Sequence, residues 1–457
     1  MPARATVSIA DVPGSFTGHV ISPDDPAYDP ARTVVYGDID KRPAVILRPA
    51  DVDDVVRAVN LARDKGSELA VRCGGHSVAG HSVSEGGIVI DLRDLKAIDI
   101  DADGRTAWAD AGLTAAEYST AANAYGLATG FGDTGSVGIA GITLGGGVGL
   151  LVRKYGLTID SLLAADLVTA DGRVLRVDEE HEPDLFWAIR GGGGNFGVAT
   201  RFRFRLEPVD RIVGGMLFLP ASADVVAGFV EAAEAAPEEL SGIATVMPAP
   251  PMPFLPEEHH GKLVLMAILV HSVGGEAGDR ALAPFRALAE PLADLLRPMP
   301  YPEIYPPEDE SYHPTAVAQT MFVDRIDHAV ADTIMDRLES SDAAMRATQF
   351  RILGGAMARV PVEATAFAHR KSRIMVNLAA FYEGPDDRMV RREWVDEFAK
   401  ALQQEDRGAY VNFLADEGEE RVRQAYPGPT WDRLAEIKSR YDPTNLFRMN
   451  QNIPPNG

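Results

Sequence analysis

The sequence predicts an α+β protein with more than one domain, and two observations support this. The chain has 457 residues, which by length alone corresponds to about two to three domains. Its first half shows short strand patterns separated by glycine-rich turns, and longer helical patterns appear after Glu207 and Pro208. Strands and helices combined in this way are typical of α+β architecture.

The composition is that of a soluble globular protein. Hydrophobic residues make up 46% of the chain and charged residues 24%, and no apolar run approaches the length of a membrane span. The formal net charge of −23 would repel phosphate backbones and anionic lipid. We therefore expect neither nucleic acid nor membrane as a partner.

Two features favour the cytoplasm. The N-terminus has no sustained apolar segment after Arg4, which argues against a signal peptide. Cys73 is the single cysteine, which excludes an internal disulfide and a multi-cysteine metal site and fits a reducing compartment. We therefore expect a cytoplasmic protein.

The first elements follow the order strand, helix, strand, loop, strand. Residues 44–48 form an apolar strand pattern, and a helix follows with Asp51 as its N-cap and Gly66 at its end. Strand patterns cover residues 69–72 and 87–92. This order suits an α+β nucleotide-binding unit.

The strand at 69–72 leads into a double glycine followed by histidine. Gly74 and Gly75 lack a Cβ, so the backbone can turn sharply and bring its N–H groups close to a ligand phosphate. His76 then offers a nucleophilic imidazole. We interpret the stretch as the site of a flavin bonded to this histidine; the alternative is an ordinary glycine turn with a packed or solvated histidine.

A second glycine-rich stretch covers residues 130–149. So many glycines in one window cost backbone entropy unless close approach or a positive φ requires them. A flat, extended ligand lying on the backbone is one such reason. The alternative is a set of bulges and turns at sheet edges.

The next elements end in a third glycine cluster. Strand patterns at 162–169 and 173–177 flank Asp171 and Gly172, which predicts a β-hairpin. A short helix is predicted over 184–190, followed by glycines and then by an alternating strand over 198–206.

The glycines of this cluster, Gly192, Gly194 and Gly197, match the spacing of a dinucleotide-binding fingerprint but not its context. Such a fingerprint follows a strand and opens a helix, with an acidic residue about 20 residues further on. Here a helix precedes, a strand follows and the acid is missing, so we reject NAD binding.

The second half predicts a sheet with helices. Strands are expected over 263–270 and 374–382, and helices over 276–295, 328–341 and 387–403.

Two proline clusters, 248–256 and 298–307, are expected to be irregular loops because proline cannot donate to a strand ladder. Between them, His259 and His260 follow two glutamates. Adjacent histidines point to different faces of a strand or helix, so we expect a solvated loop and no metal site.

With these pieces placed, the chain resembles the flavin-dependent oxidases of the vanillyl-alcohol-oxidase superfamily, and within it the berberine-bridge-enzyme-like family. The motifs that carry the resemblance span nearly the whole chain in family order. They are 72–77 (RCGGHS), 137–141 (VGIAG) with 145–149 (GGGVG), 192–198 (GGGNFGV), and 441–453 (YDPTNLFRMNQNI) after 410–412 (YVN).

The resemblance implies a two-part FAD-binding domain with an inserted substrate domain. The FAD-binding domain would comprise residues 1–210 and a C-terminal segment, 406–457, that returns to it. Residues 211–405 would form the substrate domain, whose antiparallel sheet covers the flavin ring.

The resemblance also implies how FAD is held. In this family the histidine of the Gly-Gly-His motif, here His76, is bonded to the flavin 8α carbon. Many members add a second bond from a cysteine, at the position of Thr134 in this chain, so we expect one covalent bond only. The flavin contacts carried over are Arg72, Cys73, Gly74, Gly75, Ser77, Val78, Asp133, Thr134, Ser136, Val137, Gly138, Gly141, Ile142, Gly147, Val198, Asn412 and Asn450.

The implied reaction removes two electrons from an alcohol, amine or similar C–H centre of a small molecule such as a sugar or natural product. A base takes the heteroatom proton as hydride passes to the flavin, and O2 reoxidises the flavin to give H2O2. Tyr410 is the candidate base; alternatively it only packs near the flavin. His369 and Arg370 are secondary candidates on the substrate side.

The resemblance assigns Val137 to the flavin face that meets oxygen, where valine leaves room and leucine tends to block access. An oxidase is therefore the first interpretation. A dehydrogenase that uses another electron acceptor is the second, and a flavin-bearing binding protein without turnover is the third.

Overall fold

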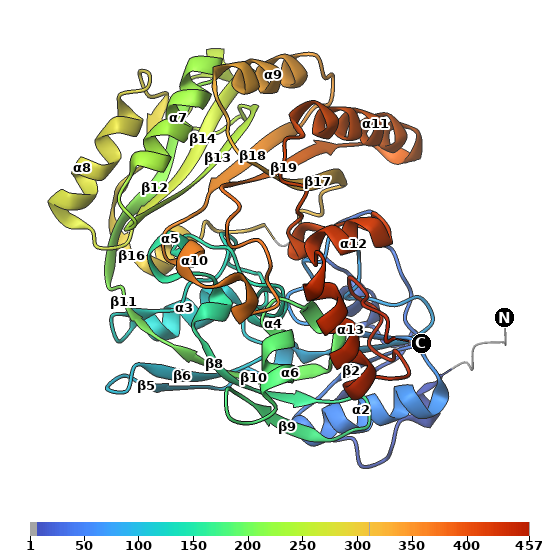
Figure 1. Cartoon of the computed structure of the whole chain (residues 1–457). Helices are drawn as coiled ribbons and strands as arrows, with labels where there is room; N and C mark the ends of the chain where they lie inside the picture. The colour runs from blue at the N-terminus through green and yellow to red at the C-terminus, as the bar shows by residue number, and fades with distance from the viewer. Residues whose placement is uncertain (1–6, 310, 457) are drawn as a thin grey trace.

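The computed structural model describes residues 7–309 and 311–456, and within them the strands form sheets of four, five, two and eight strands. The four- and five-stranded sheets lie in the lower half of the molecule in Figure 1, and the eight-stranded sheet lies in the upper half. The α+β class predicted from the sequence is confirmed.

The four-stranded sheet contains the first strand–helix–strand unit. β2 and β3 each pair with β4 in parallel, and β1 pairs with β2 antiparallel. Helix α2 (Val52–Lys65) begins where the Asp51 carboxylate accepts the backbone N–H of Asp54 and ends at Gly66, with φ of 60°. The strands, in spatial order, are β1 (His19–Ile21), β2 (Val45–Arg48), β4 (Ile88–Asp91) and β3 (Leu69–Arg72).

The five-stranded sheet is antiparallel, and β10 lies at its centre. The phenyl rings of Phe202 and Phe204 in β10 are fully buried, while Arg203 and Arg205 point to the exposed face, as alternation predicts. Its strands in order are β5 (Ile98–Asp101), β6 (Thr106–Asp110), β10 (Val198–Arg205), β8 (Leu162–Val168) and β9 (Val174–Val177).

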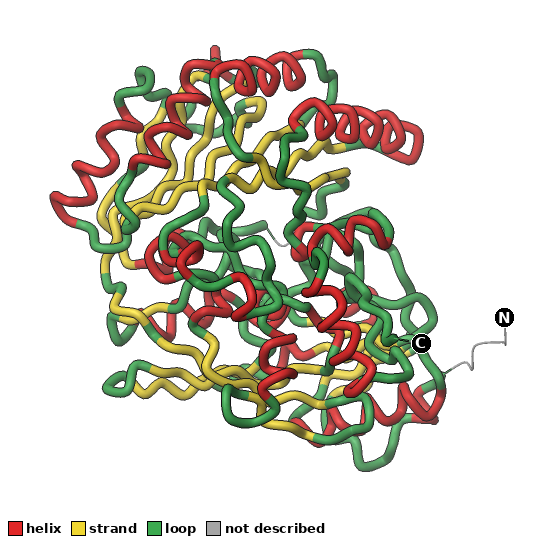
Figure 2. Tube along the Cα trace, in the orientation of Figure 1, coloured by secondary structure: helices red, strands yellow, loops and turns green. Residues whose placement is uncertain are grey.

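The eight-stranded sheet is antiparallel, and its long helices lie on one face (Figures 1 and 2). The covering helices are α7 (Ala223–Ala235), α8 (Gly275–Arg286), α9 (His328–Glu339) and α11 (Gly384–Leu402). The strands in order are β15 (Ala293–Asp294), β12 (Arg211–Pro220), β14 (Leu263–His271), β13 (Leu240–Pro248), β18 (Arg346–Ile352), β19 (Ile374–Phe381) and β17 (Ala316–Val323), with β16 (Arg297–Pro300) beside β12.

The C-terminal part of the chain packs back onto the first half. Buried residues of α13 share one hydrophobic core with residues of α6, of β10 and of the tail up to Ile453. The remaining elements are α1 (Tyr28–Arg32), α3 (Ala115–Asn123), α4 (Ile139–Leu144), α5 (Val152–Tyr155), α6 (Pro183–Ile189), α10 (Ala356–Arg359), α12 (Glu419–Ala425), α13 (Pro429–Tyr441) and the paired strands β7 (Leu127–Ala128) and β11 (Glu207–Pro208).

This arrangement agrees with a two-part FAD-binding region and an inserted sheet domain. The domain limits themselves, 1–210, 211–405 and 406–457, stay predictions.

Two expectations about the second half are wrong. The helix expected over 276–295 ends at Arg286, and the chain then forms the short strand β15. The proline cluster at 298–307 is not wholly irregular, because Pro298 and Pro300 belong to β16 at the edge of the sheet. Prolines at alternate positions of an edge strand leave the intervening residues free to complete the ladder.

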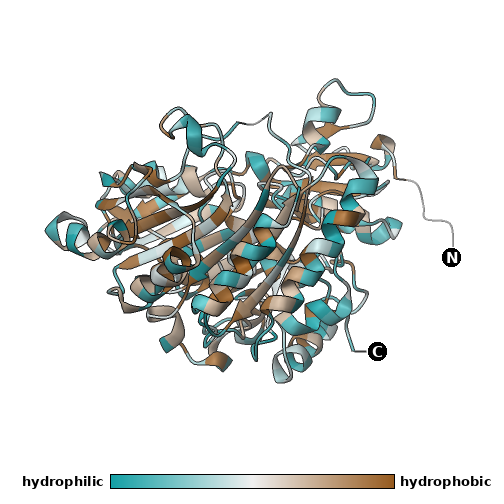
Figure 3. Ribbon diagram, turned by 90° about the horizontal axis from the view of Figure 1, so that it is seen from above, coloured by the Kyte–Doolittle hydropathy of each residue, from teal (hydrophilic) through white to brown (hydrophobic). Residues whose placement is uncertain are grey.

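Seen from above, the covering helices carry both hydrophilic and hydrophobic residues (Figure 3). Their buried side chains pack on the sheet and their polar side chains face outward, as in surface helices of globular proteins. Among the described helices, none has the length and apolar character needed to cross a membrane.

Candidate active site

A cavity of about 480 Å³ lies where the flavin-type motifs meet the face of the large sheet opposite α7, α8, α9 and α11. Its walls come from the glycine loops of the first half, from the C-terminal segment and from β17, β18 and β19. This volume falls in the range of small-molecule binding sites. The predicted site residues that line it are Cys73, Gly74, Gly75, His76, Ser77, Val78, Asp133, Thr134, Val137, Gly138, Gly141, Ile142, Val198, Tyr410, Asn412 and Asn450.

The loop after β3 is shaped by its two glycines. Gly75 has φ of 76°, a left-handed conformation that favours glycine. A Cβ on Gly74 would lie 2.5 Å from the backbone nitrogen of Gly138, so this loop touches the second glycine-rich stretch directly. Glycine is required here because two backbones meet at the edge of the cavity.

Cys73 follows β3, and its thiol is engaged in a hydrogen bond to the backbone. The Sγ lies 2.8 Å from the carbonyl oxygen of Ala111 and donates to it. Burial raises the pKa of the Cys73 thiol to about 11. The side chain is therefore a neutral thiol near pH 7 and a poor nucleophile.

Arg72 does not line the cavity, and its flavin contact carried over from the family stays a prediction. Its guanidinium donates to the carbonyl oxygens of Ala31 and Thr33, the latter at 2.5 Å. The side chain thus holds the N-terminal segment against β3. This contact could not be read from the motif, because its acceptors are backbone groups about 40 residues away.

His76 lies at the cavity wall and contacts a second predicted residue. Its Nε2 is 2.8 Å from Ser136 Oγ, and the Ser136 hydroxyl in turn donates to the carboxylate of Glu308. Burial lowers the pKa of His76, an effect that Glu308 and Asp133 partly oppose. The imidazole is therefore neutral near pH 7, as a nucleophile must be.

Tyr410 comes from the C-terminal segment, and its hydroxyl is held by three donors. The backbone N–H groups of Gly147 and Val148 donate to it at 3.1 and 3.2 Å, and the Asn412 amide donates at 2.9 Å. Gly147 therefore contacts Tyr410 through its backbone and does not itself line the cavity. Burial raises the pKa of Tyr410, while these three donors and nearby Arg351 oppose the rise.

The sheet side of the cavity is polar, which the sequence reasoning missed. Gln349 and Arg351 lie on one face of β18, and Asn377 on β19 pairs with Gln349. The Arg351 guanidinium donates to Asp133 at 2.6 Å and stacks over the Phe413 ring at 4.8 Å. The available signal was the alternation of polar and apolar residues along 346–352.

His369 and Arg370 are buried structural residues and do not line the cavity. The Arg370 guanidinium makes two hydrogen bonds to the Asp160 carboxylate, at 2.7 and 2.8 Å. His369 Nε2 lies 3.1 Å from the carbonyl oxygen of Ala425. These contacts do not support their predicted substrate-side role, which stays a prediction.

Comparisons with known proteins show to which family this chain belongs. A family model described as "FAD binding domain" matches residues 43–178, and one described as "Berberine and berberine like" matches residues 409–454. The chain is 30% identical to (R)-6-hydroxynicotine oxidase of Paenarthrobacter nicotinovorans, over 97% of this chain and 98% of that protein. An FAD-linked oxidoreductase of Bacillus subtilis is 31% identical over 96% and 98%. This chain belongs to the berberine-bridge-enzyme-like family.

Solved structures agree with this assignment. The crystal structure of 6-hydroxy-D-nicotine oxidase from Arthrobacter nicotinovorans is similar with a TM-score of 0.85 and 29% identity, covering 97% of this chain and 99% of that one. A xylooligosaccharide oxidase from Myceliophthora thermophila shares the fold, with a TM-score of 0.81, 23% identity and coverage of 96% and 98%. As a member of the family, this protein is an FAD-dependent oxidoreductase.

The residues of the cavity fit a flavin nucleotide. A Cβ on Gly141, in α4, would meet no atom within 4 Å, so this helix presents open backbone to the cavity. In the part of the chain that the structure describes, the side-chain oxygens of Asn377 and Asn450 are buried without a hydrogen-bond partner. Buried amide oxygens of this kind need a donor, which a bound flavin or substrate can supply.

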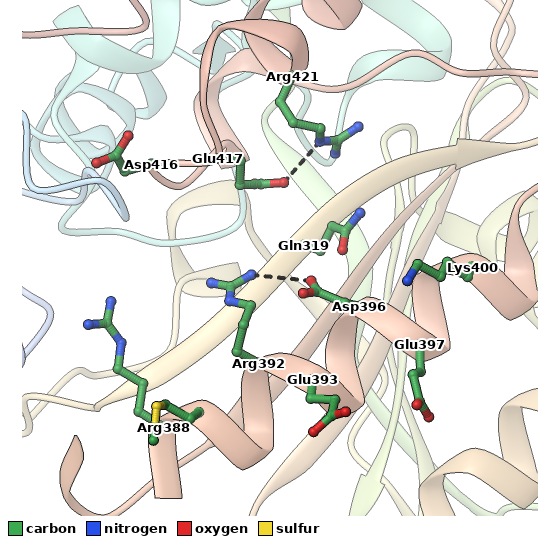
Figure 4. Close-up of a pocket in the computed structure, with 11 residues that line it drawn as sticks. Gln319, Arg388, Arg392, Glu393, Asp396, Glu397, Lys400, Asp416, Glu417 and Arg421 are labelled. Carbon is green, nitrogen blue, oxygen red and sulfur yellow. Dashed lines mark hydrogen bonds and ion pairs between the residues drawn. The ribbon is translucent and has the colours of Figure 1, made fainter. Parts of the chain in front are cut away.

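A second, larger groove of about 790 Å³ lies beside α11 (Figure 4) and is distinct from the cavity described above. Charged side chains of both signs line it, with Arg421 2.9 Å from Glu417 and Arg392 3.9 Å from Asp396. None of the predicted flavin contacts borders this groove. We therefore assign the chemistry to the smaller cavity.

No cluster of three or more histidine, cysteine or acidic side chains that could hold a metal occurs among residues 7–309 and 311–456. The two adjacent histidines, His259 and His260, lie at a short 3-10 turn over Glu257–His259.

Proposed function

We propose that this protein is an FAD-dependent oxidase that takes two electrons from an alcohol- or amine-type C–H centre of a small molecule and passes them to O2, giving H2O2. The observation that carries the proposal is the meeting of His76, the Tyr410 hydroxyl and the polar sheet face in one cavity. FAD supplies the two-electron chemistry, and the protein's residues place the substrate and move its proton.

His76 would hold FAD by one covalent bond. Its neutral imidazole borders the cavity, whereas the only thiol, that of Cys73, donates to a backbone carbonyl. Thr134 lines the cavity where many relatives carry a second attachment cysteine, and a hydroxyl is a much weaker nucleophile than a thiolate. These contacts support attachment through His76 alone.

Tyr410 would accept the substrate proton. A neutral phenol oxygen has two lone pairs, and three donors point at this oxygen, an environment that suits the phenolate formed on deprotonation. Only the phenolate can accept a proton, and it is the minor form near neutral pH because burial raises the pKa of Tyr410 above the ordinary tyrosine value. The three donors stabilise the negative charge of this phenolate, which takes the substrate proton and returns to the phenol.

The polar sheet face would orient the substrate. Gln349 and Asn377 offer amide donors and acceptors, and Arg351 offers a guanidinium that Asp133 and Phe413 hold in place. Such groups suit the hydroxyl and carbonyl oxygens of a sugar or natural product. The related oxidases whose names specify 6-hydroxynicotine and xylooligosaccharide support a small-molecule substrate of this range.

O2 is proposed as the acceptor because Val137 lines the cavity, and the family resemblance assigns this position to the flavin face that meets oxygen, where a valine would leave room. A flavin dehydrogenase with another electron acceptor is the second candidate. We also propose a cytoplasmic location, which the single cysteine supports.

A substrate screen tests the function. The holoprotein is mixed anaerobically with alcohols, amines, oligosaccharides and aromatic natural products, and bleaching of the flavin absorbance is recorded. Positive compounds are repeated in air with an oxygen electrode and a peroxide assay. We expect O2 consumption and H2O2 in equal amounts; bleaching without O2 consumption in air would favour the dehydrogenase.

Acid precipitation tests the flavin attachment. We expect the precipitate of wild-type protein to keep its yellow colour and fragmentation of the flavin-bearing tryptic peptide, residues 73–93, to place the flavin on His76, while His76→Ala releases all of its flavin. Flavin placed on Cys73 within that peptide, or complete release of flavin from the wild type, would contradict a single bond through His76.

A further inference from the structure

We infer that Glu308, acting through Ser136, selects the tautomer of His76 that bonds to the flavin and receives the proton that His76 gives up. Glu308 is thus a positioning residue for cofactor attachment, and Ser136 links it to the histidine. The inference rests on the proposed covalent attachment and adds the group that makes His76 reactive.

The three side chains form a continuous hydrogen-bonded row from parts of the chain far apart in sequence. His76 Nε2 lies 2.8 Å from Ser136 Oγ, and the Ser136 hydroxyl donates to Glu308 Oε2. The backbone N–H of Ser136 donates to the other carboxylate oxygen, Oε1, at 2.9 Å. Both oxygens of Glu308 therefore hold Ser136, and Glu308 is fixed in direction although its residue is exposed.

The segment that carries Glu308 is anchored. Tyr301 is fully buried, Tyr305 is 8% exposed, and both rings belong to the core of the FAD-binding region. Gly135 makes room for the segment, since a Cβ there would lie 3.2 Å from Tyr305 Cβ and 3.5 Å from Glu308 Oε1. The contact between the two segments is therefore built into the fold.

The direction of the hydrogen bonds follows from the carboxylate. An ionised carboxylate only accepts, so the Ser136 hydroxyl must donate its hydrogen to Glu308. The Ser136 oxygen then accepts from His76, which requires the hydrogen of the imidazole to be on Nε2. His76 Nδ1 is left with its lone pair free, and this is the nitrogen that can attack.

The attachment step balances with O2 as the oxidant. The Nδ1–C8α bond forms as one C–H bond of the flavin 8-methyl group breaks, and His76 loses its Nε2 hydrogen as a proton. Two protons and two electrons leave in total, and they reduce one O2 to H2O2. Ser136 and Glu308 form the path that takes the histidine proton, so that alkylation does not leave a positive charge on a buried imidazole.

Substituting the carboxylate of Glu308 tests the direction of the hydrogen bonds that join it through Ser136 to His76. In Glu308→Gln the amide can donate to the Ser136 oxygen, so that the serine hydroxyl can donate to Nε2 and the hydrogen moves to Nδ1. Ser136→Ala removes the link, and Ser136→Thr keeps the hydroxyl. Asp309→Asn is the matched control, because its carboxylate is adjacent in sequence but bonds to Ser311.

Full-length proteins from riboflavin-limited cells are mixed with FAD in air, and samples taken over time are denatured in detergent and read by in-gel flavin fluorescence. Retention of FAD on a desalting column before denaturation reports non-covalent binding separately. We expect Glu308→Gln and Ser136→Ala to slow covalent incorporation by ~10²-fold, the scale of lost proton-transfer catalysis, with non-covalent binding retained. Ser136→Thr and Asp309→Asn should match the wild type.

A second measurement needs no variant. The flavin peptide of the wild type is analysed by NMR for the imidazole nitrogen that carries the flavin, and Nδ1 is expected. Attachment through Nε2, or a wild-type rate of incorporation in Glu308→Gln, would overturn the inference while leaving covalent attachment intact. A wild type without covalent flavin would instead overturn the attachment itself, and the inference with it.

Discussion

At the scale of single residues, substitution of Tyr410 tests the proposed proton transfer. Its hydroxyl is held by Gly147, Val148 and Asn412 and is buried beside the cavity. Tyr410→Phe removes one oxygen and leaves the ring packed on Phe413. We expect the rate of flavin reduction by substrate to fall by ~10²-fold or more with a nearly unchanged flavin spectrum.

The pH dependence of flavin reduction provides a second test of Tyr410 as the base. Because the pKa of Tyr410 is raised above its ordinary value of 10.0, the phenolate is the minor form at neutral pH. Flavin reduction should therefore accelerate as pH rises through the alkaline range in the wild type, and this rise should be missing in Tyr410→Phe. Reduction at a normal rate in the variant would show that the tyrosine is structural.

Val137 offers a test of oxygen access. Its side chain has no proton or charge to give, so it can act only by leaving space, and one added methylene in a close-packed site fills the room a small molecule needs. Val137→Leu should slow reoxidation of the reduced flavin by O2 and spare reduction by substrate. The flavin spectrum is the control for an undisturbed site, and equal reoxidation rates would contradict the proposed access route.

Residue placement shows what a motif can and cannot predict. Thr134, Val137 and Asn450 line the cavity, and the motifs that contain them led us to expect all three beside the flavin. Arg351 and Glu308 were missed because their roles depend on contacts with Asp133 and Ser136, more than 170 residues away in the sequence. Such pairs carry no local pattern.

At the scale of elements, α13 fastens the C-terminal segment to the FAD-binding region through a buried ion pair. Lys438 and Asp442 are 2.6 Å apart and both side chains are fully buried. The Lys438 ammonium also donates to the carbonyl oxygens of Asn195 and Phe447, and Asp442 accepts the backbone N–H groups of Leu446 and Phe447. The pair therefore joins α13, the third glycine cluster and the tail.

Asp442→Ala should destabilise the protein by about 3–5 kcal/mol, because it leaves a buried ammonium without its partner. Urea unfolding of the holoprotein, followed by circular dichroism, measures the change. Glu436→Ala, an exposed position on the same helix, should change the free energy of unfolding by no more than about 0.5 kcal/mol. Equal stabilities for the two variants would contradict the anchoring role of the pair.

The second glycine-rich stretch shows why element prediction was incomplete. Gly132, Gly138 and Gly141 of the stretch 130–149 line the cavity, so a ligand on this backbone stays a prediction, whereas a Cβ on Gly149 would lie 1.7 Å from the carbonyl oxygen of Phe131, where two backbone segments come close. The short helix α4 inside this stretch was not predicted. Glycine content shows where backbones come close, but not which neighbour requires it.

At the scale of the whole molecule, the fold class and the family were predictable because several motifs appear in one order along the chain. What the sequence did not predict is how the two regions meet. The Arg351–Asp133 ion pair and the Glu308–Ser136 contact both join the first half to the segment between the motifs. The cavity is formed by this meeting, and its polar wall belongs to the part of the chain without a motif.

The central claim is that this FAD-dependent oxidoreductase is an oxidase, and the reaction of its reduced flavin with oxygen tests it most directly. The purified holoprotein is reduced anaerobically by light and an electron donor, then mixed rapidly with air-saturated buffer while the oxidised flavin absorbance is followed. We predict reoxidation faster than that of free reduced flavin, with H2O2 as the product. Reoxidation no faster than that of free reduced flavin would contradict the account and favour a dehydrogenase.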